Sequence, residues 1–115
     1  MPFRLGYHTV EADGTVTMTG AEDTVFEVTS ERMVEAYVDL TSMKAGDSII
    51  VRQHMRIAPG GPYVKYGEVP FDDVQPFPLL WIVPKPGAYG VKLTIQQTAG
   101  ANRTFPYAGF TENRH

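Results

Sequence analysis

Apolar and polar residues alternate with a period of two along much of the chain, and this pattern predicts β-strands. The clearest case is segment 89–96, where Tyr89, Val91, Leu93 and Ile95 alternate with polar residues. Successive side chains of a strand point to opposite faces, so such alternation is typical of a strand with one buried face. Similar alternation occurs in residues 24–29 and 48–57.

The longest apolar run, Leu79 to Val83, lies between two prolines. A run this short between breakers predicts a strand buried on both faces, with Trp81 in the same core as Val91, Leu93 and Ile95. The following Lys85-Pro86-Gly87 has turn chemistry, because proline fixes φ and glycine accepts positive φ. The pattern therefore predicts a hairpin that joins strand 79–83 to strand 89–96.

Other turn signals predict two more hairpins. Asp13-Gly14 predicts a hairpin between residues 7–10 and 15–19. The proline- and glycine-rich segment 58–62 predicts a turn between strand 48–57 and a partner strand at 63–68.

Segment 30–40 fits either a helix or a strand, and the strands predicted around it favour a strand. We expect it to pair with strand 48–57, with Leu40 opposite Ile49. Val69 to Phe77 is irregular and predicts a crossover between sheets. Residues 103–110 predict a last strand, placed at a sheet edge because Pro106 lacks an N–H group.

These elements predict one domain over residues 1–115, with an N-terminal arm at 1–5 and a polar tail at 111–115. The chain of 115 residues is long enough for one core. Eight or nine short strands with regularly spaced turns are typical of an all-β fold. The predicted architecture is an antiparallel β-sandwich of jelly-roll type.

Composition excludes several kinds of partner. The chain has no cysteine, a net charge of −3 and a pI near 5.5. It lacks the basic excess of general nucleic-acid binders, so no nucleic-acid partner is expected. No run reaches the ~20 apolar residues of a membrane-spanning helix, and the N-terminus has no signal-peptide core, so a soluble protein without membrane contact is expected.

No catalytic or cofactor motif is present. The three histidines, His8, His54 and His115, lack metal-ligand spacing, and no serine has a G-x-S-x-G setting. The expectation is a protein that is not an enzyme and has no cofactor and no metal. The adjacent acids Asp72 and Asp73 are expected to be solvated in a loop. The alternative is that they bind calcium, with Asp47 or Glu68 completing the site.

Three groups of residues are candidate protein contacts. Arg52, His54 and Arg56 share one strand face. The predicted register places them opposite Tyr37, Glu35 and Met33, as either a solvated face or a cationic strip that docks an acidic neighbour. Phe71, Phe77 and Tyr107 lie beside prolines and are expected to be exposed, at a subunit interface or as a sugar-stacking platform. The segment Pro2, Phe3, Arg4 and Leu5 is either a frayed or edge segment or an arm that docks on a neighbouring subunit.

Two stretches carry a family resemblance. They are AGDSIIVR, from Ala45 to Arg52, and YGVKLTIQQTAG, from Tyr89 to Gly100, followed by RTFPY at 103–107. Over residues 33–110 the chain resembles small β-sandwich virion proteins of tailed bacteriophages and archaeal viruses. The resemblance implies a capsid decoration or accessory protein, made in the host cytoplasm and located in the virion.

This resemblance also implies partners. They are other virion subunits, in a homo-oligomer for which the resemblance favours a trimer and the general frequency of oligomers a dimer. The runner-up function is a carbohydrate-binding or receptor-binding module. A cupin-like enzyme is a weaker alternative, because paired metal-ligating histidines are missing.

Overall fold

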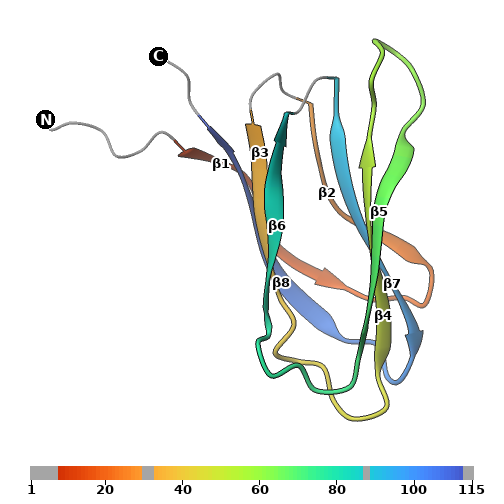
Figure 1. Ribbon diagram of the computed structural model, residues 1–115. Helices are drawn as coiled ribbons and strands as arrows, with labels where there is room; N and C mark the ends of the chain where they lie inside the picture. Colours follow the sequence, from red (N-terminus) through yellow and green to blue (C-terminus); the bar gives the residue numbers. More distant parts are fainter. Residues whose placement is uncertain (1–7, 30–32, 87–88, 113–115) are drawn as a thin grey trace, which may run out of the picture.

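The computed structural model describes residues 8–29, 33–86 and 89–112, and over these residues the fold is all-β. The strands are β1 (His8–Thr17), β2 (Glu22–Val28), β3 (Met33–Asp39), β4 (Ser48–Met55), β5 (Val64–Asp72), β6 (Leu79–Pro86), β7 (Val91–Ala99) and β8 (Thr104–Glu112). They form two four-stranded antiparallel sheets that pack face to face (Figure 1). Sheet I has the order β1-β8-β3-β6 and sheet II the order β2-β7-β4-β5. The predicted antiparallel β-sandwich is confirmed.

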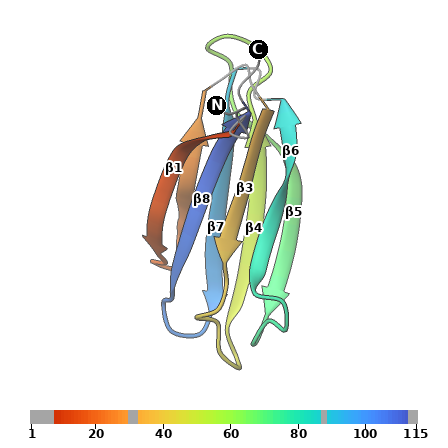
Figure 2. The ribbon, with the colours of Figure 1, turned by 90° about the vertical axis from the view of Figure 1, so that its left-hand side faces the viewer.

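The strand pairing is that of a jelly roll. The ladders β1–β8, β2–β7, β3–β6 and β4–β5 join the first strand to the last, the second to the seventh, and so on inward. This is the pairing of one long hairpin, which then rolls up so that β8 also pairs with β3 and β7 with β4. The predicted jelly-roll type is therefore confirmed (Figure 2).

Of the predicted hairpins, only β4–β5 is present, and its strand β5 extends into the segment that was predicted to be irregular, as far as Asp72. The remaining connection, 73–78, does cross between the sheets, as predicted. Strands β6 and β7 lie in different sheets, so the predicted hairpin of 79–83 with 89–96 is wrong. The predicted pairing of 30–40 with 48–57 is wrong for the same reason, although 33–39 is a strand. Turn signals favour pairing of neighbours in sequence, whereas most jelly-roll connections cross the sandwich.

The predicted hairpin at Asp13-Gly14 is replaced by one strand, β1, with a bulge between Val10 and Ala12. Gly14 pairs with Tyr107 of β8, and its φ of 142° is in the range that favours glycine. A Cβ atom at Gly14 would lie 3.6 Å from the Tyr107 hydroxyl. This is an ordinary van der Waals distance, so glycine is favoured here by its positive φ within a strand, and not by a turn or by lack of space.

The core lies between the inner faces of the two sheets. Val34, Ala36 and Val38 of β3 alternate into it, and Phe105 of β8 is fully buried. The buried apolar side chains are Met18, Val25, Phe26, Val28, Val34, Ala36, Val38, Leu40, Met43, Ile49, Val51, Ile82, Val91, Leu93, Ile95 and Phe105. These contributions from both sheets make a single core, which burial of apolar surface stabilises.

Trp81 is not in this core, and the prediction that it is buried is wrong. Within the described part of the chain, strand β6 pairs only with β3, so it is an edge strand there. Its side chains alternate: Ile82 is buried, whereas Leu79 is 60% and Trp81 50% exposed. A short apolar run does not distinguish a strand buried on both faces from an edge strand that is apolar on its outer face. Trp81 Nε1 donates a hydrogen bond to Glu35 Oε2 (2.6 Å) on the outer surface.

Three further expectations fail at strand ends and edges. Strand β8 lies between β1 and β3, not at an edge, and Pro106 is tolerated one residue beyond the last β3–β8 pair, Val38–Tyr107. Ile57 and Tyr89 are exposed because they lie outside β4 and β7. A period of two predicts which way a side chain points only inside a strand. It no longer applies to residues beyond the last paired residue.

Candidate functional site

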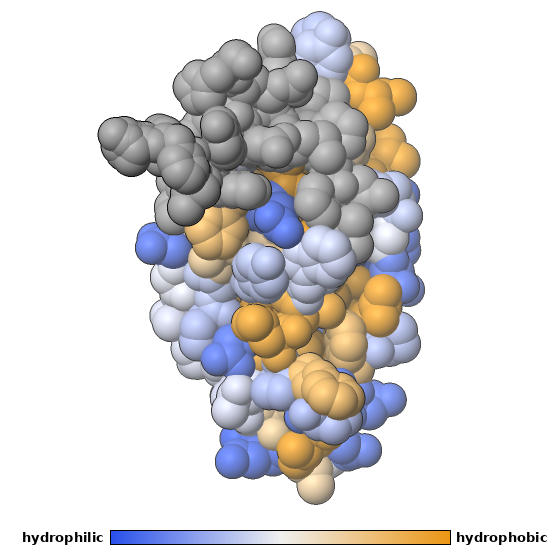
Figure 3. Space-filling view, turned by 60° about the vertical axis from the view of Figure 1, so that its left-hand side comes forward, coloured by the Kyte–Doolittle hydropathy of each residue, from blue (hydrophilic) through white to orange (hydrophobic). Residues whose placement is uncertain are grey.

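The outer face of sheet I is rich in aromatic and apolar side chains. We call it the aromatic face and define it by Tyr37, Leu79, Trp81, Ala108 and Phe110. Tyr37 lies opposite Trp81 on one side and Ala108 on the other. The rings of Tyr37 and Phe110 meet edge to face, with centroids 6.2 Å apart. Apolar residues gather across this side of the molecule in Figure 3.

A groove of about 220 Å³ opens on this face. It is lined by Tyr37, Asp39, Leu79, Pro106, Tyr107 and Ala108. Small-molecule pockets are commonly about 300–1,000 Å³, so the groove suits one side chain or one small group. The pocket between the sheets, beside Gln53 and Tyr66, holds only about 10 Å³, roughly one water molecule.

Among the described residues, Asp39 is the only charged one that lines the groove. Its Oδ1 atom accepts hydrogen bonds from the hydroxyl and the backbone amide of Thr41. These bonds, the hydroxyl's first, lower the pKa of the Asp39 carboxyl below its ordinary value of 3.8. The groove therefore carries a negative charge at neutral pH.

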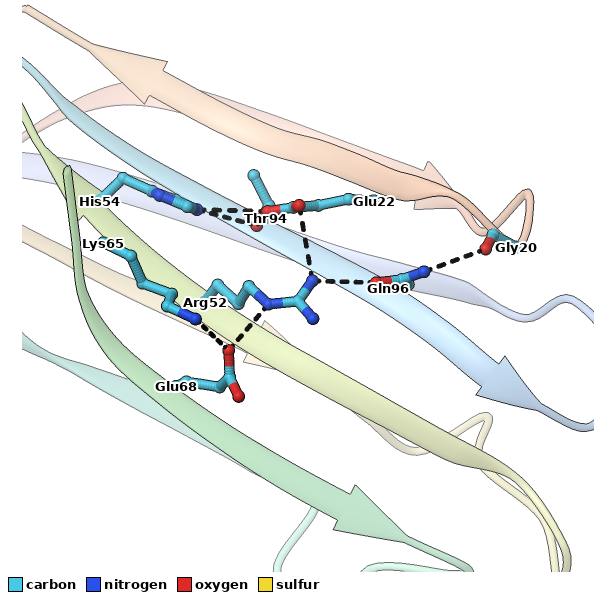
Figure 4. A network of polar contacts seen from close by, with 8 residues as sticks. All are labelled: Gly20, Glu22, Arg52, His54, Lys65, Glu68, Thr94 and Gln96. Carbon is cyan, nitrogen blue, oxygen red and sulfur yellow. Dashed lines mark hydrogen bonds and ion pairs between the residues drawn. The ribbon is translucent and has the colours of Figure 1, made fainter. Parts of the chain in front are cut away.

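The outer face of sheet II is polar and its charges are paired (Figure 4). Glu22 accepts a hydrogen bond from the Thr94 hydroxyl (2.6 Å) and lies within 3.5 Å of Arg52 and 3.3 Å of His54. Chiefly because of the Thr94 bond, the pKa of Glu22 is lowered. Arg52 and Lys65 both contact Glu68, at 2.9 and 2.7 Å, and the bond from Lys65 is the main cause of its lowered pKa.

A second cluster on this face surrounds Tyr63. Its hydroxyl donates to Glu27 Oε2 (2.6 Å), and its ring lies 4.4 Å from the Arg56 guanidinium and 4.8 Å from Lys92 Nζ. Burial, aided by the bond to Glu27, raises the pKa of Tyr63 to about 12. Tyr63 therefore stays neutral in the physiological range.

The structure places Arg52, His54 and Arg56 on one outer face but gives them other partners than predicted. Glu35 and Tyr37 lie in the other sheet. The observed acidic partners are Glu22, Glu27 and Glu68, which belong to the same chain. Such ion pairs near the surface contribute ~0–1 kcal/mol each. This face therefore resembles the solvated face with cross-strand pairs more than an open cationic strip.

The three aromatic residues predicted to be exposed contacts differ in burial. Phe77 is 88% exposed, as expected. Phe71 and Tyr107 are partly buried and pack against the core, Tyr107 with its ring stacked on Phe26 at 6.4 Å. Residues Pro2 to Leu5 and 113–115 lie outside the described residues.

Asp47 lies in a loop, yet it is 1% exposed and pairs with Arg103, which no pattern in the sequence indicates. Arg103 Nε donates to Asp47 Oδ2 at 2.7 Å, and Nη2 donates to Oδ1 at 3.3 Å. The Lys44 amide also donates to Asp47, and the Gly46 amide donates to Asp73. These bonds tie together the loops at one end of the sandwich. They also engage Asp47 and Asp73, two of the acids of the calcium alternative, and no group of three metal-ligating residues occurs in the described part of the chain.

Acid should weaken the Asp47 contribution to stability. The hydrogen bond from Arg103 lowers the pKa of Asp47 against the opposing effect of burial. A carboxyl with a lowered folded-state pKa stabilises the fold above its unfolded pKa, and that contribution is lost as pH falls through the folded value. We expect the difference in unfolding free energy between wild type and Asp47→Asn to narrow as pH falls from 6 toward 2. Urea titrations at each pH would measure it, and a constant difference would contradict the assignment.

Exposed apolar residues concentrate on one side of the sandwich. Of the nine large exposed apolar side chains among the described residues, seven lie between positions 64 and 81: Val64, Tyr66, Val69, Val74, Phe77, Leu79 and Trp81. This segment comprises β5, β6 and their connection. The two strands are the last in their sheets and lie on the same side in Figure 2. This side therefore combines two open strand edges with apolar side chains.

No family model, no curated protein and no solved structure matches this chain. Within the described residues no helix could cross a membrane.

Proposed function

We propose that this protein is a non-enzymatic virion subunit, a capsid decoration or accessory protein that works as an oligomer and binds other capsid subunits. The observation that carries the proposal is the exposed apolar surface of the aromatic face and the β5–β6 side. Monomeric proteins rarely leave such side chains grouped in water, and grouped ones mark interaction sites. Trp, Tyr and Phe are also the residues enriched at interfaces.

Two further points support the virion assignment. One is the resemblance of residues 33–110 to small virion proteins. The other is the jelly-roll topology, which occurs in viral capsid domains but also in lectins and cupins. The topology is an analogy at the level of the fold, and one fold hosts many functions. The resemblance and the apolar surface therefore carry more weight.

A carbohydrate-binding module is the second candidate, and Trp81 favours it. Its ring is half-exposed and its Nε1 atom is held by Glu35, so the indole is fixed on the surface beside Tyr37. A fixed aromatic ring offers a stacking surface at low entropic cost. A glycan array separates the two candidates, because a binding module should retain sugars as an isolated domain and a virion subunit should not.

Sedimentation velocity over a range of concentrations tests the proposal. We expect wild type to associate. The double variant Leu79→Glu/Trp81→Glu should need at least about tenfold higher protein concentration to associate to the same extent, since a loss of about 1.4 kcal/mol of association free energy raises Kd tenfold. The matched control is Ile57→Glu/Tyr89→Glu, which charges two exposed apolar positions outside segment 64–81. The control should behave as wild type. A strict monomer without affinity for virion shells would contradict the proposal.

A further inference from the structure

The groove on the aromatic face combines the features that hold an arginine side chain. Leu79, Pro106 and Ala108 give it an apolar wall, and Tyr37 contributes an aromatic ring. Asp39 adds one carboxylate, whose Oδ1 is bonded to Thr41. Arginine has an apolar stem, stacks on aromatic rings and pairs with carboxylates through its planar guanidinium. The groove thus fits the stem and the head of this residue together.

The surroundings of the groove favour a cation. Asp13 lies opposite Ala108, and Glu35 lies opposite Phe110, two residues along β8 from Ala108, so both are on the outer side of sheet I. Among the described residues whose side chains lie on this face, the charged ones are Asp13, Glu35 and Asp39. An acidic surface attracts a basic segment and raises its rate of encounter.

The chain itself contains a segment of matching chemistry, Pro2-Phe3-Arg4-Leu5. Arg4 supplies the cation, and its neighbours Phe3 and Leu5 are apolar like Leu79 and Trp81 beside the groove. We propose that the segment Pro2–Leu5 of one subunit docks on the aromatic face of a second copy, with the Arg4 side chain in the groove. This inference rests on the proposed function, because it assumes that copies assemble.

Reach favours a second copy over the same chain. His8 pairs with Glu112, whereas the groove lies at Pro106, six residues further along β8. Six strand residues span roughly 20 Å. Residues 4–7 cover at most about 14 Å when fully extended, so within one chain the Arg4 head could reach the groove only with the backbone fully stretched and its side chain extended as well. Strand β1 also runs from His8 toward the groove end of the sheet, so residues before His8 would have to reverse direction to approach it.

A peptide titration tests the inference directly. The probe is a peptide of residues 1–7, MPFRLGY, added to protein that lacks residues 2–5 and followed by ¹H–¹⁵N NMR. We expect saturable shifts around Tyr37, Tyr107 and Ala108. A peptide with Arg4→Gln should bind at least about tenfold more weakly, and so should the wild-type peptide to Asp39→Asn protein, because each change removes one charge of the pair.

Two controls make the result specific. Asp39→Asn retains an oxygen for the Thr41 amide, and a thermal melt checks that it folds. Asp13→Asn removes a charge from the same face outside the groove, and should change peptide affinity less than about twofold if screening weakens its effect. Equal binding of the Arg4→Gln peptide, no binding at all, or shifts caused instead by a neutral methyl glycoside would overturn the inference.

The proposed function is tested separately by sedimentation. If wild type associates and the Leu79→Glu/Trp81→Glu variant does not, while the peptide fails to bind, the inference falls and the proposed function stands. If the peptide binds but the intact protein neither associates nor binds virion shells, the proposed function falls.

Discussion

Replacing Phe105 with alanine is expected to lower the free energy of unfolding by about 3–5 kcal/mol, the usual effect of removing a large aromatic side chain from a core. Phe105 lies in β8, between β1 and β3, and is fully buried. A chain of 115 residues has only about 6–17 kcal/mol of total stability. The variant should therefore unfold at a clearly lower urea concentration.

Trp81→Ala is the matched comparison, because it also removes a large aromatic residue from sheet I. Trp81 is half-exposed, so only part of its area and one surface hydrogen bond are lost. We expect a cost of about 1 kcal/mol. Urea unfolding of both variants measures the difference. Equal costs would mean that β6 does not occupy the edge position or that its side chains face the other way.

Gly100→Ala is the second change with a large expected effect. Gly100 has a φ of 91°, and a Cβ atom there would overlap Asp47 Oδ1. Positive φ costs a residue with a side chain ~1–2 kcal/mol, and the overlap with a packed group adds ~1–3 kcal/mol. The Asp47 carboxylate would have to move from Arg103, which holds the loops at this end of the sandwich.

Gly20→Ala is the control that separates the steric overlap with Asp47 from the backbone strain of a positive φ. Gly20 also has a φ of 91°, but an added Cβ would meet nothing within 4 Å. Gly20→Ala should therefore show only the strain of about 1–2 kcal/mol. Thermal and urea unfolding of the two variants should differ by the cost of displacing Asp47. Equal destabilisation would contradict a tightly packed Asp47 site.

Strand positions could largely be predicted from the sequence, but strand partners could not. The alternation of Val34, Ala36 and Val38, and of Val91, Leu93 and Ile95, identifies the inner faces of β3 and β7 without any knowledge of the pairing. Strand β3 pairs with β6, at least forty residues away, and with β8, and the first strand pairs with the last. Local turn chemistry reports only on neighbouring strands, so it identified the β4–β5 hairpin and suggested two that do not exist.

The candidate surfaces were predictable only in part, for related reasons. The common facing of Arg52, His54 and Arg56 follows from one strand, but their acidic partners come from β2 and β5. The pair Asp47–Arg103 joins positions 56 residues apart, so no local sequence pattern predicts it. The groove needs β3, β6 and β8 side by side, and it becomes visible only once the rolled pairing is known.

Hydroxyl-radical footprinting tests most directly whether the aromatic face is a contact surface. Oxidation of Leu79 and Trp81, read by mass spectrometry, reports the exposure of these side chains at concentrations above and below the association midpoint. Ile57 and Tyr89, exposed elsewhere, are internal controls. We predict that Leu79 and Trp81 become protected in the assembled protein while Ile57 and Tyr89 react as before. Unchanged oxidation of Leu79 and Trp81 in an assembled sample would contradict the assignment of this face as the contact surface.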